Sequence, residues 1–260
     1  EAASGRDLMQ FRRWYDQAGT PVVTAYGEYL ADQEIYRLTL SQQTPATPGQ
    51  SDKAPLHMPI TLGLIGPDGQ DLDFEGAEVS LDGQSRSQVL SLTEAQQVFE
   101  IKGVAQAPLP SIARGFSAPI KLLMDYSAEE LAFLCRHDSD PFNRWEAGQR
   151  LAVQAALRFI RTAKNPQSDT VFDEGYLNAM RQVLSNASLD AAFKELVLTL
   201  PSETYISEQL ESVDPQYVHA VREAMRLQLA TALQADWAWA FEAHKDNGGY
   251  RPEPVAAGRR

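Results

Sequence analysis

The sequence has a single cysteine and no long apolar run. One cysteine, Cys135, cannot form a disulfide within the chain, which is compatible with a reducing compartment. It lies in the apolar stretch 131–135, so we expect a small buried side chain rather than a nucleophile. No stretch reaches the roughly 18 to 20 apolar residues of a transmembrane helix, and the first residues lack the order of a signal peptide. These absences predict a soluble, cytoplasmic protein without a membrane partner.

Positive charge is also scarce. Lysine and arginine number 23 against 35 aspartates and glutamates, which gives a formal net charge of −12. Nucleic-acid backbones and anionic membrane surfaces attract basic proteins, so neither is expected as the main partner. The 260 residues are 43% hydrophobic, enough for one large core or two ordinary ones.

Motifs that carry chemistry are missing too. A zinc hydrolase places two imidazoles one helical turn apart, as in His-Glu-x-x-His, because one metal must reach both nitrogens. Here the four histidines are scattered along the chain: His57, His137, His219 and His244. The Gly-x-Ser-x-Gly elbow, the P-loop and the dinucleotide glycine fingerprint do not occur either. We therefore assign no catalytic, cofactor-binding or metal-binding residue.

A few polar groups allow two interpretations. Residues 137–140, His-Asp-Ser-Asp, offer three potential metal ligands in four positions, but helix capping explains the acids without a metal. The acidic pairs Glu129–Glu130 and Asp173–Glu174 could serve acid–base catalysis, but such pairs are usually solvated turns or helix starts. Trp237 and Trp239 cannot share one helical face, so we expect one in the core and the other at a contact surface.

What is present divides into two patterns. From about residue 22 to Cys135 the apolar residues alternate, as in the runs 36–40 and 60–64, which predicts half-buried strands. The turn signals are Gly66-Pro67-Asp68-Gly69 and Asp82-Gly83, and residues 106–110 carry two prolines that no central strand could hold. About seven short strands in this length favour a β-sandwich.

After His137 the apolar period becomes 3.6, so the sequence predicts helices. Asp140 can cap the first of them, with Pro141 at its first position and Trp145 buried at the junction with the sandwich. Two further helix faces follow, the second behind the candidate cap Ser188: Tyr176, Met180, Val183 and Leu184, then Leu189, Phe193, Leu196 and Val197. Short loops such as 199–202 favour antiparallel pairs of the kind stacked in α-solenoids.

The last predicted helix opens at Asp214-Pro215 and continues until Asn247-Gly248-Gly249. Its apolar stripe runs for about seven turns and comprises Val218, Val221, Met225, Leu229, Leu233, Trp237 and Phe241. A helix of this length needs neighbours. We find no sequence repeat of fixed period, so the solenoid interpretation rests on the helix pattern alone.

Six motifs in order resemble the bacterial alanyl aminopeptidases of the aminopeptidase N type, zinc metallopeptidases of the M1 class. They are FRRWYDQAGTP at 11–21, LSQQTPATPGQ at 40–50, LHMPI at 56–60, FSAPIKL at 116–122, FLCRHDSDPFNRWEAGQ at 133–149 and LTLPSETYI at 198–206. The resemblance implies an immunoglobulin-like β-sandwich followed by an α-helical, solenoid-like domain. It implies a tail of the catalytic domain at 1–19, the sandwich domain at 20–137, and the first part of the helical C-terminal domain at 138–260.

The same resemblance has a negative implication for this chain. The family's zinc motif, its substrate-amine loop and its catalytic tyrosine match no position here, so no site residue carries over. We expect a non-catalytic middle segment, with zinc and peptide substrates belonging to the parent protein and both ends cut. Its neighbours would be the upstream catalytic domain and the downstream helical repeats. Phe11, Trp14 and Tyr15 should be only partly covered, and the end at 250–260 should be open.

Two alternatives stay open. The sandwich could be a free-standing binding module for a peptide or a carbohydrate, since sandwiches often serve that purpose. The chain could also be a hydrolase that uses acidic residues in an unrecognised arrangement.

Overall fold

The computed structural model describes residues 5, 7–80, 83, 85–245, 248–249 and 251–253. The chain forms two compact units. The first comprises residues 1–126 and 137–143, and the second comprises residues 127–136 and 144–260. The segment 137–143 therefore belongs with the first unit, although the residues on both sides of it belong with the second.

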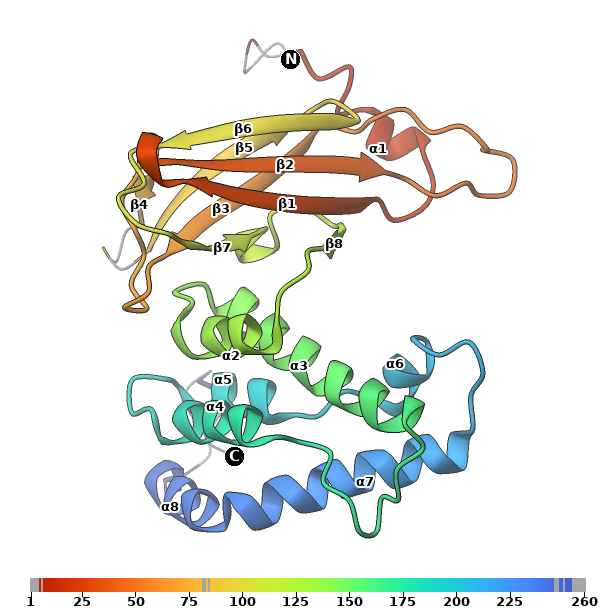
Figure 1. Ribbon diagram of the computed structural model, residues 1–260, viewed down its shortest axis with the longest axis vertical. Helices are drawn as coiled ribbons and strands as arrows, with labels where there is room; N and C mark the ends of the chain where they lie inside the picture. The colour runs from red at the N-terminus through yellow and green to blue at the C-terminus, as the bar shows by residue number, and fades with distance from the viewer. Residues whose placement is uncertain are drawn as a thin grey trace. The chain divides into compact units, whose positions relative to one another are not determined.

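The first unit is a sandwich of two four-stranded sheets, drawn as two layers in Figure 1. Its strands are β1 (Val22–Leu30), β2 (Ile35–Gln43), β3 (Met58–Ile65), β4 (Glu78–Val79), β5 (Arg86–Leu92), β6 (Gln96–Lys102), β7 (Leu109–Ile112) and β8 (Lys121–Leu123). One sheet has the order β6-β2-β1-β8 and the other β4-β5-β3-β7. All pairs are antiparallel except β1 with β8.

Alternation along the strands builds the sandwich core. In β2 the inward residues Tyr36, Leu38 and Leu40 are buried, while the residues between them face outward. In β3 the inward set is Met58, Ile60, Leu62 and Leu64, each fully buried. Because successive strand side chains point to opposite faces, the inward sets of the two sheets meet in a single apolar cluster. The predicted alternation is confirmed.

The turns follow the glycine and proline signals. Gly69, at φ 81°, donates its N–H to the carbonyl of Gly66 at 2.9 Å and closes the turn after β3. Pro110 lies in β7, which is an edge strand of its sheet, so its missing N–H breaks no ladder. The second predicted turn falls partly on Asp82, which lies outside the described residues.

A short helix, α1 (Arg13–Asp16), precedes the first strand. Trp14 packs against the sandwich core and donates its indole N–H to the carbonyl of His57 at 2.9 Å. Phe11 and Tyr15 remain 40% and 82% exposed. The expected partial cover of these three aromatic residues is confirmed, with Trp14 as the anchored member.

The helices begin earlier than the sequence pattern predicted. Cys135 lies in α2 (Ala128–His137), so the interpretation of the stretch to Cys135 as sandwich strand is wrong. A capping box starts this helix, because the Ser127 N–H donates to Glu130 at 2.8 Å and the Glu130 N–H donates to the Ser127 hydroxyl at 3.1 Å. Cys135 itself is fully buried, as expected.

The remaining helices are α3 (Pro141–Arg161), α4 (Glu174–Ser185), α5 (Ala191–Leu198), α6 (Glu203–Ser207), α7 (Pro215–Ala232) and α8 (Gln234–His244). Two predicted caps are present: Asp140 accepts from the Asn143 N–H at 2.9 Å, and Asp214 accepts from the Gln216 N–H at 3.0 Å. The four predicted core residues of α4 are all buried. Among the described residues no helix is long and apolar enough to cross a membrane.

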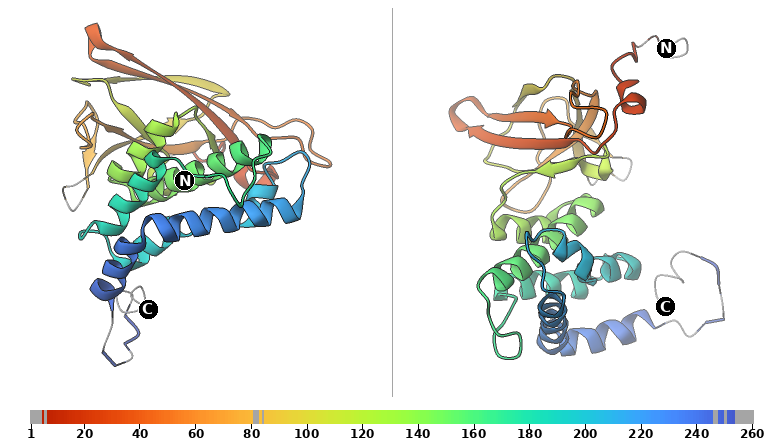
Figure 2. Two further views of the ribbon diagram at one scale, coloured as in Figure 1. Left: turned by 60° about the horizontal axis from the view of Figure 1, so that its bottom comes forward. Right: turned by 90° about the vertical axis from the view of Figure 1, so that its right-hand side faces the viewer.

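Two helix details differ from the prediction. The cap of α5 is Asp190 rather than Ser188, and Leu196 of that helix is 54% exposed. The long C-terminal stripe is interrupted at Leu233, where φ is −110°, and both views in Figure 2 show α8 turning away from α7. As a result Phe241 is 67% exposed. The predicted stop at Asn247 and most of 250–260 lie outside the described residues.

The tryptophans complete the comparison. Trp145 is half-buried, so its predicted burial is confirmed only in part. It lines an open groove beside Leu196, Pro201 and Tyr205 instead of joining the buried stripe of α3. Trp237 is half-buried and Trp239 is 44% exposed, so the expectation that one of them lies in the core is wrong.

Candidate functional site

The histidines lie in four different surroundings. His57 is 3.2 Å from the Ser91 hydroxyl in the sandwich unit, and His137 ends α2. In the helical unit His219 is 2.8 Å from Glu203, and His244 is 3.1 Å from the Lys194 amine. No group of three or more His, Cys, Asp or Glu among the described residues could hold a metal ion.

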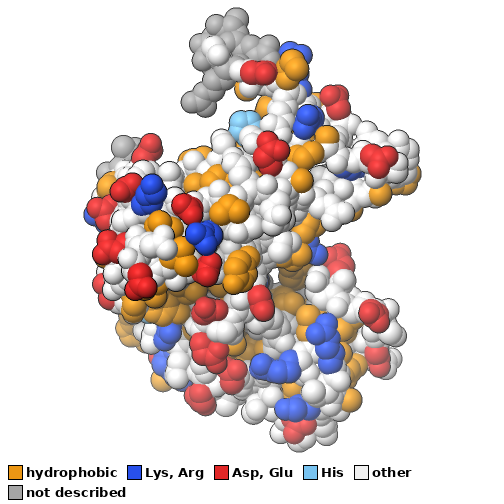
Figure 3. All heavy atoms as spheres, turned by 45° about the horizontal axis from the view of Figure 1, so that its top comes forward, with side chains coloured by type: hydrophobic (Ala, Val, Ile, Leu, Met, Phe, Trp, Pro, Cys, Tyr) orange, Lys and Arg blue, Asp and Glu red, His pale blue; other side chains and the backbone are white. Residues whose placement is uncertain are grey.

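The acidic pairs and the cysteine have structural roles. Glu130 belongs to the capping box of α2, and Asp173 caps α4 by accepting the Tyr176 N–H at 2.9 Å. These are the helix starts that the sequence allowed for both pairs. Burial raises the pKa of the Cys135 thiol to about 11, so at neutral pH it stays protonated. Acidic side chains are otherwise scattered over the face seen in Figure 3.

The strongest concentration of buried charge is centred on Arg114, which is 4% exposed. Its guanidinium makes a two-pronged ion pair with Asp71, at 2.7 and 2.9 Å, and reaches Asp138 at 3.1 Å. The Nε atom donates to the Ser111 hydroxyl at 2.8 Å, and Nη1 also donates to the carbonyl of Arg86 at 3.0 Å. All five N–H groups of Arg114 therefore have acceptors.

This Arg114 cluster fastens the segment 137–143 to the sandwich. The Ser139 hydroxyl donates to Asp71 at 2.8 Å, and the Asn143 amide donates to the Ser111 hydroxyl at 2.8 Å. Gly63 of β3 leaves space for the guanidinium, because a Cβ at Gly63 would lie 2.0 Å from the guanidinium carbon, Cζ, of Arg114. Sequence reasoning missed the cluster, which joins residues far apart in the chain.

The electrostatics of the two carboxylates differ. For Asp71, burial would raise the pKa, but the hydrogen bonds and charge of Arg114, together with hydrogen bonds from Arg86 and Ser139, outweigh burial and hold the pKa below its usual value. For Asp138, burial raises the pKa to about 6, and Arg114 offsets this only in part. Because every donor of Arg114 is engaged inside the fold, the cluster is suited to fixing structure rather than to binding a reactant.

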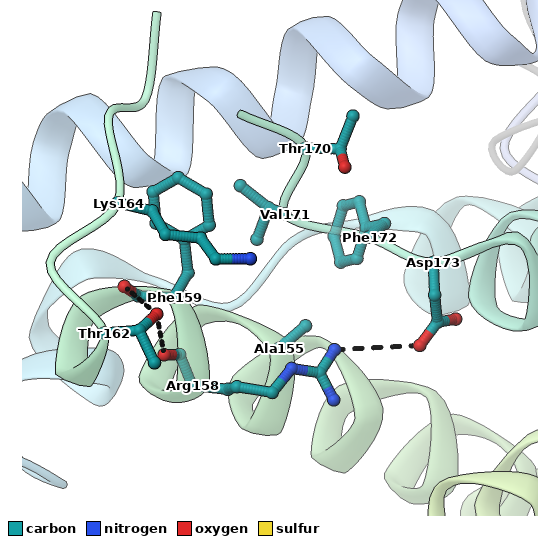
Figure 4. Close-up of a pocket in the computed structure, with 9 residues that line it drawn as sticks. All are labelled: Ala155, Arg158, Phe159, Thr162, Lys164, Thr170, Val171, Phe172 and Asp173. Atoms are coloured by element: carbon teal, nitrogen blue, oxygen red, sulfur yellow. Dashed lines mark hydrogen bonds and ion pairs between the residues drawn. The ribbon is translucent and has the colours of Figure 1, made fainter. Parts of the chain in front are cut away.

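The helical unit contains a second group of charges, around a pocket of about 190 Å³ between the end of α3 and the loop before α4. Figure 4 shows Arg158 and Asp173 reaching toward each other, 3.6 Å apart, and the Lys164 side chain directed into the space beside Val171. Gln228 of α7 holds the loop by accepting from the N–H groups of Val171 and Phe172. The Arg158 charge is thus balanced within the pocket wall.

Lys194 of α5 is a buried cation without an ion pair to any carboxylate among the described residues. Its amine is 3.1 Å from the His244 ring nitrogen and 5.3 Å from the centre of the Trp239 ring. Burial lowers the pKa of Lys194, and the negative charge of Asp190 opposes that change.

Comparison with known proteins places both units in one family. Residues 19–125 match the domain of unknown function DUF3458 with an Ig-like fold, and residues 128–260 match its C-terminal part, DUF3458_C, described as ARM repeats. The chain belongs to this family. The predicted fold class, an Ig-like sandwich followed by a solenoid-like helical part, is confirmed.

Curated relatives of this chain include aminopeptidases N from several bacteria. Aminopeptidase N of Escherichia coli is 39% identical over 236 residues, which is 90% of this chain and 26% of the relative. Aminopeptidase N of Caulobacter vibrioides is 38% identical over 258 residues, which is 99% of this chain and 28% of the relative. This confirms the predicted resemblance. The chain spans about a quarter of the length of these relatives.

A solved structure shares the fold. The crystal structure of Legionella pneumophila aminopeptidase A in complex with aspartic acid matches 99% of this chain and 28% of its own, with a TM-score of 0.78 and 22% identity. At that identity the match supports the fold alone.

Proposed function

We propose that this chain is the non-catalytic middle segment of a zinc-dependent aminopeptidase, a hydrolase that releases N-terminal amino acids from peptides. The observation that carries the proposal is the match to aminopeptidase N, 39% identical yet covering only 26% of that protein. Residues 1–19 would be the tail of the catalytic domain. The partners would be that domain, the downstream helical repeats and, for the whole protein, peptide substrates.

Zinc in such an enzyme supplies a Lewis acid that activates water. The residues of this chain do not fit a site for it, because each described histidine has its own surroundings and none shares a metal-sized cluster with two further ligands. We therefore derive no catalytic step from this chain. The lone buried cysteine is in keeping with a cytoplasmic location.

The role of scaffold is supported by how the sandwich is built. Its core is continuous, and the Arg114 cluster ties the segment 137–143 to it with fully paired donors. Phe11 and Tyr15 stand exposed beside the anchored Trp14, which gives a neighbouring catalytic domain an apolar surface to cover. A rigid spacer between two domains needs these properties more than it needs a reactive group.

The test compares this chain with the product of its complete coding sequence, which the proposal expects to be a longer protein. Purified with added zinc, the chain should not hydrolyse alanine p-nitroanilide and should hold far less than one zinc per molecule. The longer protein should contain His-Glu-x-x-His upstream and hydrolyse the anilide in a chelator-sensitive reaction. Stoichiometric zinc and turnover in the chain alone would overturn the proposal, as would a coding sequence without that motif.

A further inference from the structure

A groove of about 300 Å³ in the helical unit combines an apolar floor with positive charge. Its apolar lining comprises Leu198, Leu200, Leu229 and Trp237. The indole N–H of Trp237 donates to the carbonyl of Leu229 at 3.3 Å, which orients the ring. Two arginines of α7, Arg222 and Arg226, lie along the edge, and no acidic residue lines the groove.

Arg222 is held in place by one bond and otherwise open. Its Nε donates to the carbonyl of Pro201 at 2.9 Å, and Gln149 donates to the carbonyl of Thr199 at 2.8 Å in the same loop. Among the described residues neither Nη atom of Arg222 has a hydrogen-bond or ion-pair partner. A half-buried guanidinium fixed at Nε presents its two outer nitrogens as a fork for a planar anion.

The second arginine is already neutralised. Arg226 pairs with Glu223 one turn away, at 2.6 Å, with the two side chains 66% and 39% exposed. Arg226 first, and the charge of Arg222 to a smaller extent, lower the pKa of Glu223, so this one carboxylate serves both arginines and leaves a net positive charge beside the apolar floor. In a chain with a formal net charge of −12, such a cation is the feature of the groove that points to a ligand.

We propose that this groove binds a carboxylate next to a compact apolar group, with the carboxylate on the Nη atoms of Arg222 and the apolar group against Leu229 and Trp237. The volume suits one leucine-sized residue. Two sources share this chemistry: a free N-blocked amino acid and the C-terminal residue of a peptide. The proposal goes beyond the scaffold function and involves neither zinc nor catalysis.

The experiment is calorimetric titration of the full chain. N-acetylleucine should bind at least tenfold more tightly than N-acetylleucinamide, because only the acid forms the charged fork. Titration with acetyl-Ala-Ala-Leu distinguishes a free N-blocked amino acid from the C-terminal residue of a peptide as the ligand. An affinity equal to that of N-acetylleucine assigns the groove to single residues, and a clearly higher affinity assigns it to peptide ends. No binding of the acids up to about 10 mM, or equal binding of acid and amide, would overturn the proposal.

Matched variants locate the site. Arg222→Gln should lower the affinity for N-acetylleucine at least tenfold and leave the affinity for N-acetylleucinamide unchanged. Arg161→Gln, at an exposed arginine that ends α3, should change neither affinity. Ala230→Phe fills the groove without touching Arg222 and should also abolish binding, while Ala235→Phe on α8 should not. Retained acid binding in both Arg222→Gln and Ala230→Phe would contradict the assignment, whatever their stability.

Discussion

Among the described residues each unit buries one cation, and the two cations have opposite surroundings. In the sandwich Arg114 is 4% exposed and has two carboxylate partners with all five donors engaged. In the helical unit Lys194 is 3% exposed, and its amine contacts an imidazole and an indole ring. A small exposed fraction is therefore no guide to how the charge of a cation is compensated. We expect the paired cation to specify the structure around it and the poorly compensated cation to contribute little to stability.

Removing the paired cation should have the largest effect. Arg114→Met leaves Asp71 and Asp138 buried without a counter-charge, and we expect it to lower the free energy of unfolding by about 3–5 kcal/mol. Chemical denaturation followed by circular dichroism measures this. The matched control is Arg37→Met, whose exposed pairs with Glu28 and Glu100 should contribute less than about 1 kcal/mol. Equal losses of unfolding free energy in Arg114→Met and Arg37→Met would contradict the distinction between buried and exposed ion pairs.

Crowding the same cation tests its fixed position. Gly63→Ala places a Cβ 2.0 Å from the guanidinium carbon, Cζ, of Arg114, so the guanidinium must leave its partners. We expect the free energy of unfolding to fall by about 1–3 kcal/mol. Gly175→Ala in the first turn of α4, whose nearest neighbour would be 3.3 Å away, serves as control. If Gly63→Ala unfolds at the same denaturant concentration as wild type, Arg114 is not held as described.

The pH dependence separates the two carboxylates. Burial raises the pKa of Asp138 from 3.8 to about 6, so its contribution to stability is fully present below pH 3.8 and is lost as pH rises through 6. Asp138→Asn cannot ionise. Between pH 4.5 and 7.5 its free energy of unfolding should therefore gain about 1–2 kcal/mol relative to wild type. A flat difference for Asp138→Asn would refute the assignment.

Removing the poorly compensated cation should have the smallest effect. Lys194→Met keeps the length and loses the charge, and we expect a change between zero and a gain of about 1 kcal/mol in the free energy of unfolding. Because burial lowers the pKa of Lys194, wild type should regain stability as pH rises through that pKa toward 10.5, and the variant should not. A loss comparable to that of Arg114→Met would show that Lys194 also specifies structure.

Local patterns explain which features were predictable. In α4 an acidic cap, Asp173, and a 3.6-residue stripe agree, so the helix and its buried face were predicted. The run 131–135 is continuously apolar, and such a run does not distinguish a strand from a helix by period. The capping box Ser127 to Glu130 was the signal that would have corrected it. The helix break at Leu233 could not be predicted, because neither glycine nor proline lies next to it in the sequence.

The candidate sites were less predictable than the fold. Asp71, Arg114 and Asp138 are separated by 43 and 24 residues, so only tertiary structure brings them together. The one local trace is a glycine, Gly63, inside a strand, which often marks a close approach of another group. The groove at Arg222 likewise depends on α5, α7 and α8 meeting, and no spacing along the chain encodes that.

The position of Asp138 also sets an order of assembly during synthesis. The last strand of the sandwich ends at Leu123, yet its buried arginine receives a second carboxylate only from residue 138. A nascent chain that has emerged as far as residue 126 holds every strand and still lacks that partner. The sandwich therefore reaches its final state only after the first helix of the other unit has left the ribosome, and a version truncated between the units would carry the defect permanently.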